Sequence, residues 1–341
     1  MIRAWAPGRV NLIGDHTDHT GGLVLPMAID LGTMVSGTRG GDVVELRSPI
    51  EPEPAIVPLD LADPAAVSPG WARYVAGVVA ELRPTVGFSG SVRTTVPVRA
   101  GLSSSAALEV AVALALGFDG RAIDLARLGQ RAEHRASGVP CGIMDQLASA
   151  GGVVGHALRI DCTSLAVQPV PLPDDLEVVV VDSGQRRELA TSAYAERAAA
   201  CQAAQASIGP LREATLADLD CLTDEVVRRR ARHVVTENAR VDQLATALTT
   251  GDRSSVADAM AASHRSLRED FEVSTQVLDE LVDRLTSLDG VIGARLTGAG
   301  FGGCTVGLVE TGALLPDDLT SWRIVPSAGA HLLDEGEGPQ Q

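Results

Sequence analysis

Two short stretches of this sequence concentrate side chains that could do chemistry. The first is the DHTDH loop, residues 15–22, in which two carboxylates and two imidazoles are followed by a glycine pair. It lies between apolar segments, so we expect a polar loop between two strands. Carboxylates accept hydrogen bonds and imidazoles donate or accept them, so the set suits a polyhydroxylated ligand. A solvated turn is the second interpretation. A metal site is the third, because the spacing matches no established metal motif.

The second stretch is the serine loop, residues 101–106, which reads GLSSSA. A strand is expected before it over residues 90–98 and a buried, Ala- and Leu-rich helix after it over residues 105–117. The first amides of a helix have no partner within the helix, and the helix dipole adds positive charge there. Gly101 allows close approach of a ligand to the backbone. The stretch predicts a phosphate-binding loop, and a helix N-cap with extra serines is the alternative.

Two further carboxylates lie near apolar residues. Glu133 comes near the end of a helix expected over residues 123–136, and Asp145 lies within the apolar segment 143–148. A carboxylate in apolar surroundings is costly to bury unless it is paired. Asp145 therefore suggests a general base or a metal ligand, and an acidic residue in the first turn of a helix is the alternative.

A glycine-rich run near the end of the chain matches the GxGxxG pattern at Gly298, Gly300 and Gly303. A dinucleotide site requires a strand before this pattern and a helix after it. Residues 304–309 instead have the composition of a strand. We therefore exclude a dinucleotide site and expect a strand–loop–strand whose backbone passes close to another loop or to a ligand.

Composition narrows the function classes. The chain has 341 residues and a formal net charge of −16, which argues against a nucleic-acid-binding protein. It contains no lysine, so neither a Walker A loop nor a protein-kinase strand lysine can be present. Any phosphate chemistry must rely on arginine, backbone amides and a metal ion.

Five scattered cysteines, a polar N-terminus and the lack of a long apolar run indicate a cytoplasmic protein that does not cross a membrane. A proline-rich segment predicts a domain boundary near residue 172, and the acidic tail, residues 334–341, is expected to be disordered. Other helices are expected at 71–82, 188–204, 223–249, 256–270 and 277–287. Strands are expected at 157–161, 176–182 and 2–14, the last one broken at residues 6–8.

Three motifs in this order, PGRVNLIGDHTDHTGG, VPVRAGLSSSAALEVA and LTGAGFGGCTV, closely resemble the galactokinase branch of the GHMP small-molecule kinase family. The resemblance covers nearly the whole chain and includes AEHRASGVPCGIMDQ and SHRSLREDFEVS. It implies an α+β fold of two domains. Residues 1–172 are similar to the second domain of ribosomal protein S5, and residues 173–333 form a ferredoxin-like domain. The active site is expected between them.

The same resemblance implies transfer of the ATP γ-phosphate to the C1 hydroxyl of α-D-galactose with Mg²⁺. By position, Asp145 is implied as the catalytic base, with Arg9 beside it. The implied sugar contacts are Asp15, His16, Asp18, Gly142 and Tyr194. The implied ATP contacts are Gly101, Leu102, Ser103, Ser104, Ser105 and Ala106 at the phosphates and Trp71 beside the adenine. Glu133 and Ser105 are implied as magnesium ligands, with Ser104 as the alternative to Ser105.

The chain departs from this family where galactokinases usually read GEHTDY. Asp15 is one methylene shorter than the usual Glu, and His19 replaces a Tyr. A GHMP kinase for another sugar, such as arabinose, N-acetylgalactosamine or a uronic sugar, is therefore the nearest alternative. A sensor that binds sugar and ATP without catalysis is a second alternative, although Ser105, Ala106, Glu133 and Asp145 are all intact. We expect a monomer whose partners are ATP and a monosaccharide, with no nucleic acid and no membrane.

Overall fold

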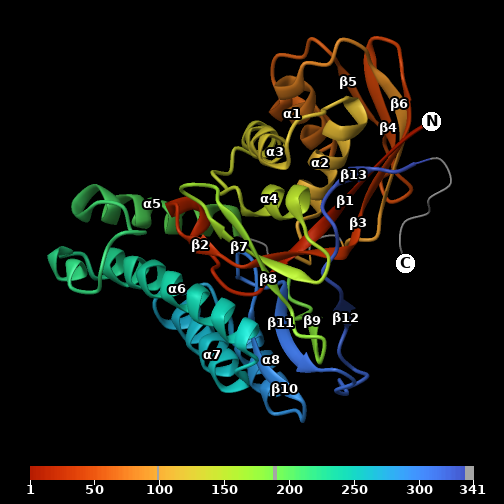
Figure 1. Ribbon diagram of the computed structural model, residues 1–341. Coiled ribbons are helices and arrows are strands. Elements are labelled where there is room, and N and C mark those ends of the chain that lie inside the picture. The colour runs from red at the N-terminus through yellow and green to blue at the C-terminus, as the bar shows by residue number, and fades with distance from the viewer. Residues whose placement is uncertain (98–99, 187–189, 335–341) are drawn as a thin grey trace.

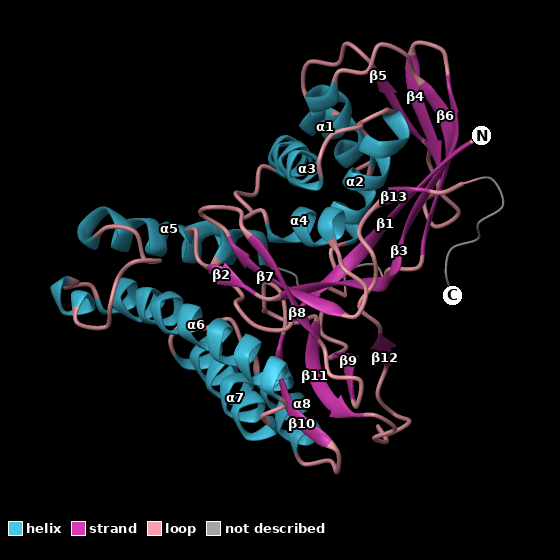
Figure 2. Ribbon diagram, in the orientation of Figure 1, coloured by secondary structure: helices cyan, strands magenta, loops and turns pink. Residues whose placement is uncertain are grey.

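The computed structural model describes residues 1–97, 100–186 and 190–334, and its elements form two units (Figure 1). A cavity lies where the two units meet. The N-terminal unit is a six-stranded sheet with helices α1 to α4. The C-terminal unit is a four-stranded sheet with α7 and α8 packed along it and α6 packed on α7 (Figure 2). The α+β fold that the sequence predicts is confirmed. No helix among the described residues is long and apolar enough to span a membrane.

The N-terminal sheet has the strand order β13-β1-β3-β6-β4-β5. Its strands are β1 (Ile2–Asn11), β3 (Pro26–Arg39), β4 (Val43–Arg47), β5 (Ala55–Pro58), β6 (Phe88–Thr94) and β13 (His331–Leu332). The helices are α1 (Ala72–Leu82), α2 (Ser104–Leu116), α3 (Ala122–Ser137) and α4 (Met144–Gly151). The inner face of the sheet and these helices enclose one apolar core, in which α2 lies against β1 and β3.

Strand β1 continues through residues 6–8, so the predicted break is wrong. Its pairing with β3 shifts register between Pro7 and Arg9, where residues 29–31 of β3 lie opposite Gly8 alone, so β3 bulges while β1 continues. The Arg9 amide donates to the carbonyl oxygen of Leu102 at 3.1 Å. A Cβ atom on Gly8 would lie 2.6 Å from the same oxygen, so glycine is needed for this approach. This contact joins β1 to the serine loop, and Arg9 lines the cavity beside it.

The C-terminal sheet has the antiparallel order β10-β11-β9-β12. Its strands are β9 (Leu176–Asp182), β10 (Val291–Leu296), β11 (Cys304–Glu310) and β12 (Ser321–Ile324). The helices are α5 (Ala190–Ile208), α6 (Glu225–Thr250), α7 (Arg253–Glu269) and α8 (Gln276–Thr286). A small third sheet of β2 (Leu23–Val24), β7 (His156–Asp161) and β8 (Val167–Pro171) joins the units, and α6 packs against it.

Most predicted elements are confirmed to within a few residues. The predicted strand over 90–98 ends at Thr94, and its last residue, Val98, lies outside the described residues, as do the start of the helix expected at 188–204 and the tail after residue 334. The glycine-rich run does connect two strands, β10 and β11. One feature was not predicted: after β12 the chain returns to the N-terminal unit, where β13 pairs with β1. The domain boundary near residue 172 stays a prediction.

The packing of α1 on α3 depends on a glycine. A Cβ atom on Gly77 would lie 2.3 Å from the carbonyl oxygen of Ala132. We expect Gly77→Ala to lower the free energy of unfolding by about 1–3 kcal/mol, because the two helices would have to separate. Gly151→Ala is the control, since the nearest atom to its new Cβ is 3.9 Å away. Equal midpoints of urea unfolding for the two variants would contradict this account.

Candidate active site

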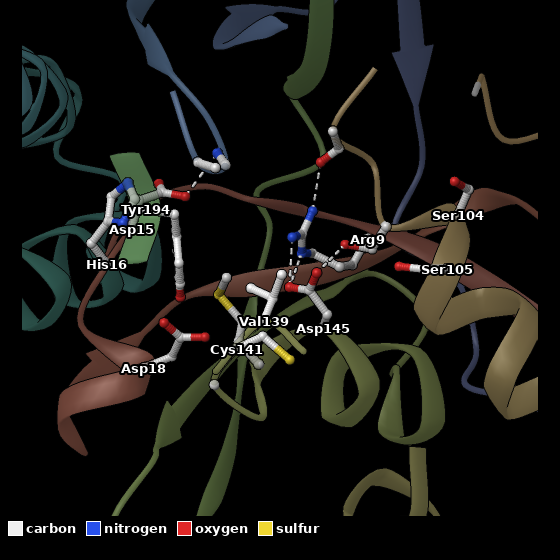
Figure 3. Close-up of a pocket in the computed structure, with 16 residues that line it drawn as sticks. Arg9, Asp15, His16, Asp18, Ser104, Ser105, Val139, Cys141, Asp145 and Tyr194 are labelled. Carbon is white, nitrogen blue, oxygen red and sulfur yellow. Dashed lines mark hydrogen bonds and ion pairs between the residues drawn. The ribbon is translucent and has the colours of Figure 1, made fainter. Parts of the chain in front are cut away.

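A cavity of about 320 Å³ lies between the two units, a volume that suits a small-molecule ligand. The DHTDH loop, the serine loop, the turn before α4 and the loop after β10 contribute its walls (Figure 3). Its lining residues are Arg9, Asp15, His16, Asp18, Gly101, Ser103, Ser104, Ser105, Val139, Cys141, Gly142, Met144, Asp145, Tyr194, Gly298 and Ala299. Segments that are far apart in the sequence are thus brought to one site.

Asp145, in the first turn of α4, forms an ion pair with Arg9 from β1. The Nε atom of Arg9 donates to Oδ1 of Asp145 at 2.6 Å, and Nη2 lies 2.5 Å from the same oxygen (Figure 3). The Nη1 atom of Arg9 donates to the carbonyl oxygen of Gly101 at 2.7 Å. The Arg9 side chain is 7% exposed and that of Asp145 is 26% exposed, so the pair is shielded while the carboxylate still faces the cavity.

The serine loop does not use its hydroxyl groups to cap α2. Ser103 is the N-cap residue and has a left-handed backbone (φ +57°), but its side chain makes no cap hydrogen bond. Its hydroxyl donates instead to Oδ2 of Asp145 at 2.5 Å. The first turn of α2 therefore has no side-chain cap at the cavity wall, where Ser104 and Ser105 lie. An uncapped helix N-terminus of this kind favours an anion.

Glu133 and Ser105, the two implied magnesium ligands, lie side by side, and their role stays a prediction. The Ser105 hydroxyl donates to Oε1 of Glu133 at 3.0 Å, and Nε2 of Gln146 donates to Oε2 at 2.5 Å. The described residues include no group of three or more His, Cys, Asp or Glu side chains that could hold a metal alone. Two hard oxygen donors beside a phosphate site nevertheless fit Mg²⁺, which usually binds one or two carboxylates plus phosphate oxygens and water.

The DHTDH loop presents the side chains of His16 and Asp18 to the cavity. His16 is 4% exposed, and neither of its ring nitrogens has a hydrogen-bond partner. Its ring packs near those of Phe271 and Tyr194, at centroid distances of 4.6 and 5.6 Å. Asp18 lies against Gly142, where a Cβ atom would lie 2.1 Å from its Oδ2 atom. Gly142 therefore makes room for the Asp18 carboxylate, and no side chain at position 142 fills the cavity that it lines.

Burial and crowding shift the pKa values of these groups. The pKa of Asp18 is raised to about 7 by burial and then by the charge of Asp145. The pKa of Glu133 is raised by the same two causes. Burial and the neighbouring His19 lower the pKa of His16 well below its usual value. A neutral imidazole can both donate and accept a hydrogen bond, as a sugar hydroxyl requires.

Most predicted site residues are brought together, and a few are not. Leu102 and Ala106 are buried behind the cavity wall, and Glu133 lies behind Ser105. Trp71 is not among the lining residues, because it packs on the N-terminal core and donates to the carbonyl oxygen of Glu53 at 3.1 Å. Its place beside an adenine stays a prediction.

Sequence reasoning missed several lining residues. Val139, Cys141, Met144, Gly298 and Ala299 were given no role. The glycine-rich run around Gly298 carried a usable signal, because a backbone that passes close to another loop was expected there. The Gly298 amide donates to Oδ1 of Asp15 at 2.8 Å. Cys141 and Met144 carried no signal beyond their position in the turn before Asp145.

Three protein-family models match this chain. Residues 2–39 match the galactokinase galactose-binding signature, residues 73–152 the GHMP kinase N-terminal domain and residues 244–323 the GHMP kinase C-terminal domain. Human galactokinase is 45% identical over 328 residues, which cover 90% of this chain and 83% of that protein. This chain belongs to the galactokinase branch of the GHMP kinase family. A galactokinase of Roseiflexus sp. is also 45% identical, over 89% of this chain and 82% of its own length.

Solved structures give the same assignment. The crystal structure of Lactococcus lactis galactokinase complexed with galactose matches this chain with a TM-score of 0.89 at 31% sequence identity. The match covers 97% of this chain and 95% of that one. A mevalonate kinase matches with a TM-score of 0.67 at 18% identity, covering 95% of this chain and 99% of its own. The second match shows a shared fold alone.

The raised pKa of Asp18 gives a pH-dependent prediction. Its pKa is about 7 in the folded protein against an ordinary value of 3.8, so folding favours the protonated form. The stabilisation is complete below the ordinary pKa and is lost as the pH rises through 7. We therefore expect Asp18→Asn to raise the melting temperature of the ligand-free protein at pH 8, with a smaller gain at pH 5. A gain that does not change with pH would argue against a buried Asp18 carboxylate.

Proposed function

We propose that this chain transfers the γ-phosphoryl group of ATP to the C1 hydroxyl of α-D-galactose. The observation that carries the proposal is the position of Asp145. It lies between the DHTDH loop, which offers neutral imidazole and carboxylate groups to a sugar, and the uncapped N-terminus of α2, which favours phosphate. Belonging to the galactokinase family supports galactose as the acceptor.

The proton transfer falls to Asp145. The C1 hydroxyl of the bound sugar gives its proton to a carboxylate oxygen, and the sugar oxygen forms a bond to the γ-phosphorus while the bond to the ADP oxygen breaks. Arg9 holds the carboxylate in place and brings a positive charge next to the transferring group. Phosphoryl transfer depends mainly on positioning and charge neutralisation, so a chain without lysine can supply what is needed.

The serine loop and Glu133 would serve the nucleotide. Gly101, Ser104 and Ser105 line the cavity where the phosphates would lie, and Ser105 with Glu133 would hold Mg²⁺. When bound, that ion neutralises phosphate charge. We assign Ser103 mainly to Asp145, because its hydroxyl already donates to the carboxylate.

We further propose that the chain acts as a monomer in the cytoplasm. All five cysteines are free, as expected for a reducing compartment.

An ATP-consumption assay with magnesium tests the acceptor. The panel holds galactose, glucose, arabinose, N-acetylgalactosamine and galacturonate. We expect selective turnover with galactose. Preference for another sugar would keep the kinase reaction and contradict galactose. Binding of ATP and sugar without any turnover would contradict the kinase and indicate a sensor.

The role of Asp145 has its own test. Asp145→Asn should lower kcat with galactose at least about a hundredfold, because the amide cannot accept the sugar proton. Binding of ATP should stay close to that of the wild type. Asp124→Asn is the matched control, since Asp124 is a surface carboxylate in the first turn of α3 that pairs with Arg121, the N-cap residue of this helix. Turnover by Asp145→Asn within a few-fold of the control would remove Asp145 from the role of base.

A further inference from the structure

Arg295 on β10 is the largest fully buried side chain among the described residues. A buried charge is costly unless it is paired and hydrogen-bonded. Two of its partners belong to the N-terminal unit: Nη2 lies 2.6 Å from Oδ2 of Asp15, and Nη1 donates to the carbonyl oxygen of Leu12 at 3.1 Å. Glu237 on α6 lies 4.0 Å away. Arg295 thus reaches from the C-terminal unit to the start of the DHTDH loop.

Asp15 is held entirely from the C-terminal unit. While Oδ2 faces Arg295, Oδ1 accepts the Gly298 amide at 2.8 Å (Figure 3), and its main-chain carbonyl lies 3.0 Å from Nε2 of His233. The side chain is 2% exposed, yet Asp15 is among the residues that line the cavity. Each carboxylate oxygen thus has one fixed partner, an amide at Oδ1 and the Arg295 charge at Oδ2.

The backbone around Asp15 is also held by groups from α6. Gly14 and His16, on either side of Asp15, have positive φ angles of 96° and 65°. The Gly14 amide donates to Oε1 of Glu237 at 3.0 Å, and the Leu23 amide donates to Oδ1 of Asn238 at 2.7 Å. These contacts hold the main chain of the loop, whereas the direction of the Asp15 carboxylate depends on Arg295 and Gly298.

We propose that Arg295 is a positioning residue for the sugar, which acts by orienting the carboxylate of Asp15 from across the interface between the two units. This inference rests on the proposed function, because it assigns a role within the same sugar site. The Asp15 side chain has a single methylene group, so a carboxylate that has turned away after losing a partner cannot reach the ligand by extending. Without Arg295 its carboxylate would be a buried charge with only one donor, and it would turn away from the orientation that meets the sugar.

The charges of the cluster explain why the effect should be specific. The cluster contains two positive charges, Arg295 and Arg240, and two negative charges, Asp15 and Glu237. The Nε atom of Arg240 lies 2.6 Å from Oε2 of Glu237. Replacing Arg295 leaves the Arg240–Glu237 pair intact and isolates Asp15. The serine loop and Glu133 have no part in this cluster, so nucleotide binding should not change.

A double-mutant cycle tests the proposal. Isothermal titration gives the Kd of galactose and of a non-hydrolysable ATP analogue for wild type, Arg295→Met, Asp15→Asn and the double variant. We expect Arg295→Met to raise the Kd of galactose at least about tenfold, because it breaks a buried ion pair and leaves the Asp15 charge uncompensated. In the Asp15→Asn background the same replacement should change it less than about threefold, because the two residues act together. The Kd of the ATP analogue should stay within about twofold.

Two further variants keep the result interpretable. Arg284→Met removes an arginine of α8 that pairs with Asp318 at the surface, and it should leave both Kd values unchanged. Arg295→Lys keeps the positive charge but lacks the planar guanidinium group of arginine. It should therefore fold even if Arg295→Met does not, and it should recover part of the galactose affinity. Folding is checked by circular dichroism.

Two outcomes would overturn the role of Arg295. One is an equal loss of galactose and nucleotide affinity, which indicates a general structural defect. The other is the same loss of galactose affinity with and without the Asp15 carboxylate. A wild-type protein that does not bind galactose would instead contradict the proposed function.

Discussion

The ion pair between Arg9 and Asp145 is the interaction on which the site depends. Arg9 comes from β1, next to its register shift against β3, and Asp145 comes from the first turn of α4. The same guanidinium donates to the carbonyl oxygen of Gly101 in the serine loop. Ser103 adds a second contact from that loop to the carboxylate. One buried arginine therefore sets the relative positions of strand, helix and loop. A small shift in any of the three would move the carboxylate relative to both ligands, and catalysis of group transfer is sensitive to such shifts.

Crowded carboxylates give the site its electrostatic character. Asp18, Glu133 and Glu109 all have raised pKa values, for which burial is the first cause and a neighbouring carboxylate the second. Glu109 and Glu133 share the amide group of Gln146, which donates to both at 3.0 and 2.5 Å. Asp18 belongs to the DHTDH loop, whereas Glu109 and Glu133 lie by the serine loop, where their charge favours a cation.

Local patterns in the sequence predicted much of the fold and part of the site. The Ala- and Leu-rich α2 and the strand–loop–strand around Gly298 follow from composition and glycine spacing, and both are confirmed. The continuation of β1 through Pro7 was missed, because a bulge depends on the partner strand. Arg295 was missed for a similar reason: one charged residue in an apolar strand has no meaning until its partner Asp15, 280 positions earlier, is placed beside it. Long-range pairing of this kind leaves no local pattern.

The return of the chain after β12 limits how the two units can move. Residues 171–176 form one connection between the units, and the segment from Ile324 to His331 forms a second. Along that second connection, the Ser327 amide donates to the carbonyl of Ala28, and the Gly329 amide donates to the carbonyl of Gly152. Two bodies joined by one strand can swing in any direction, whereas two bodies joined at two points rotate mainly about the line through both. Two connections therefore restrict the relative rotation of the two units more than a single one would.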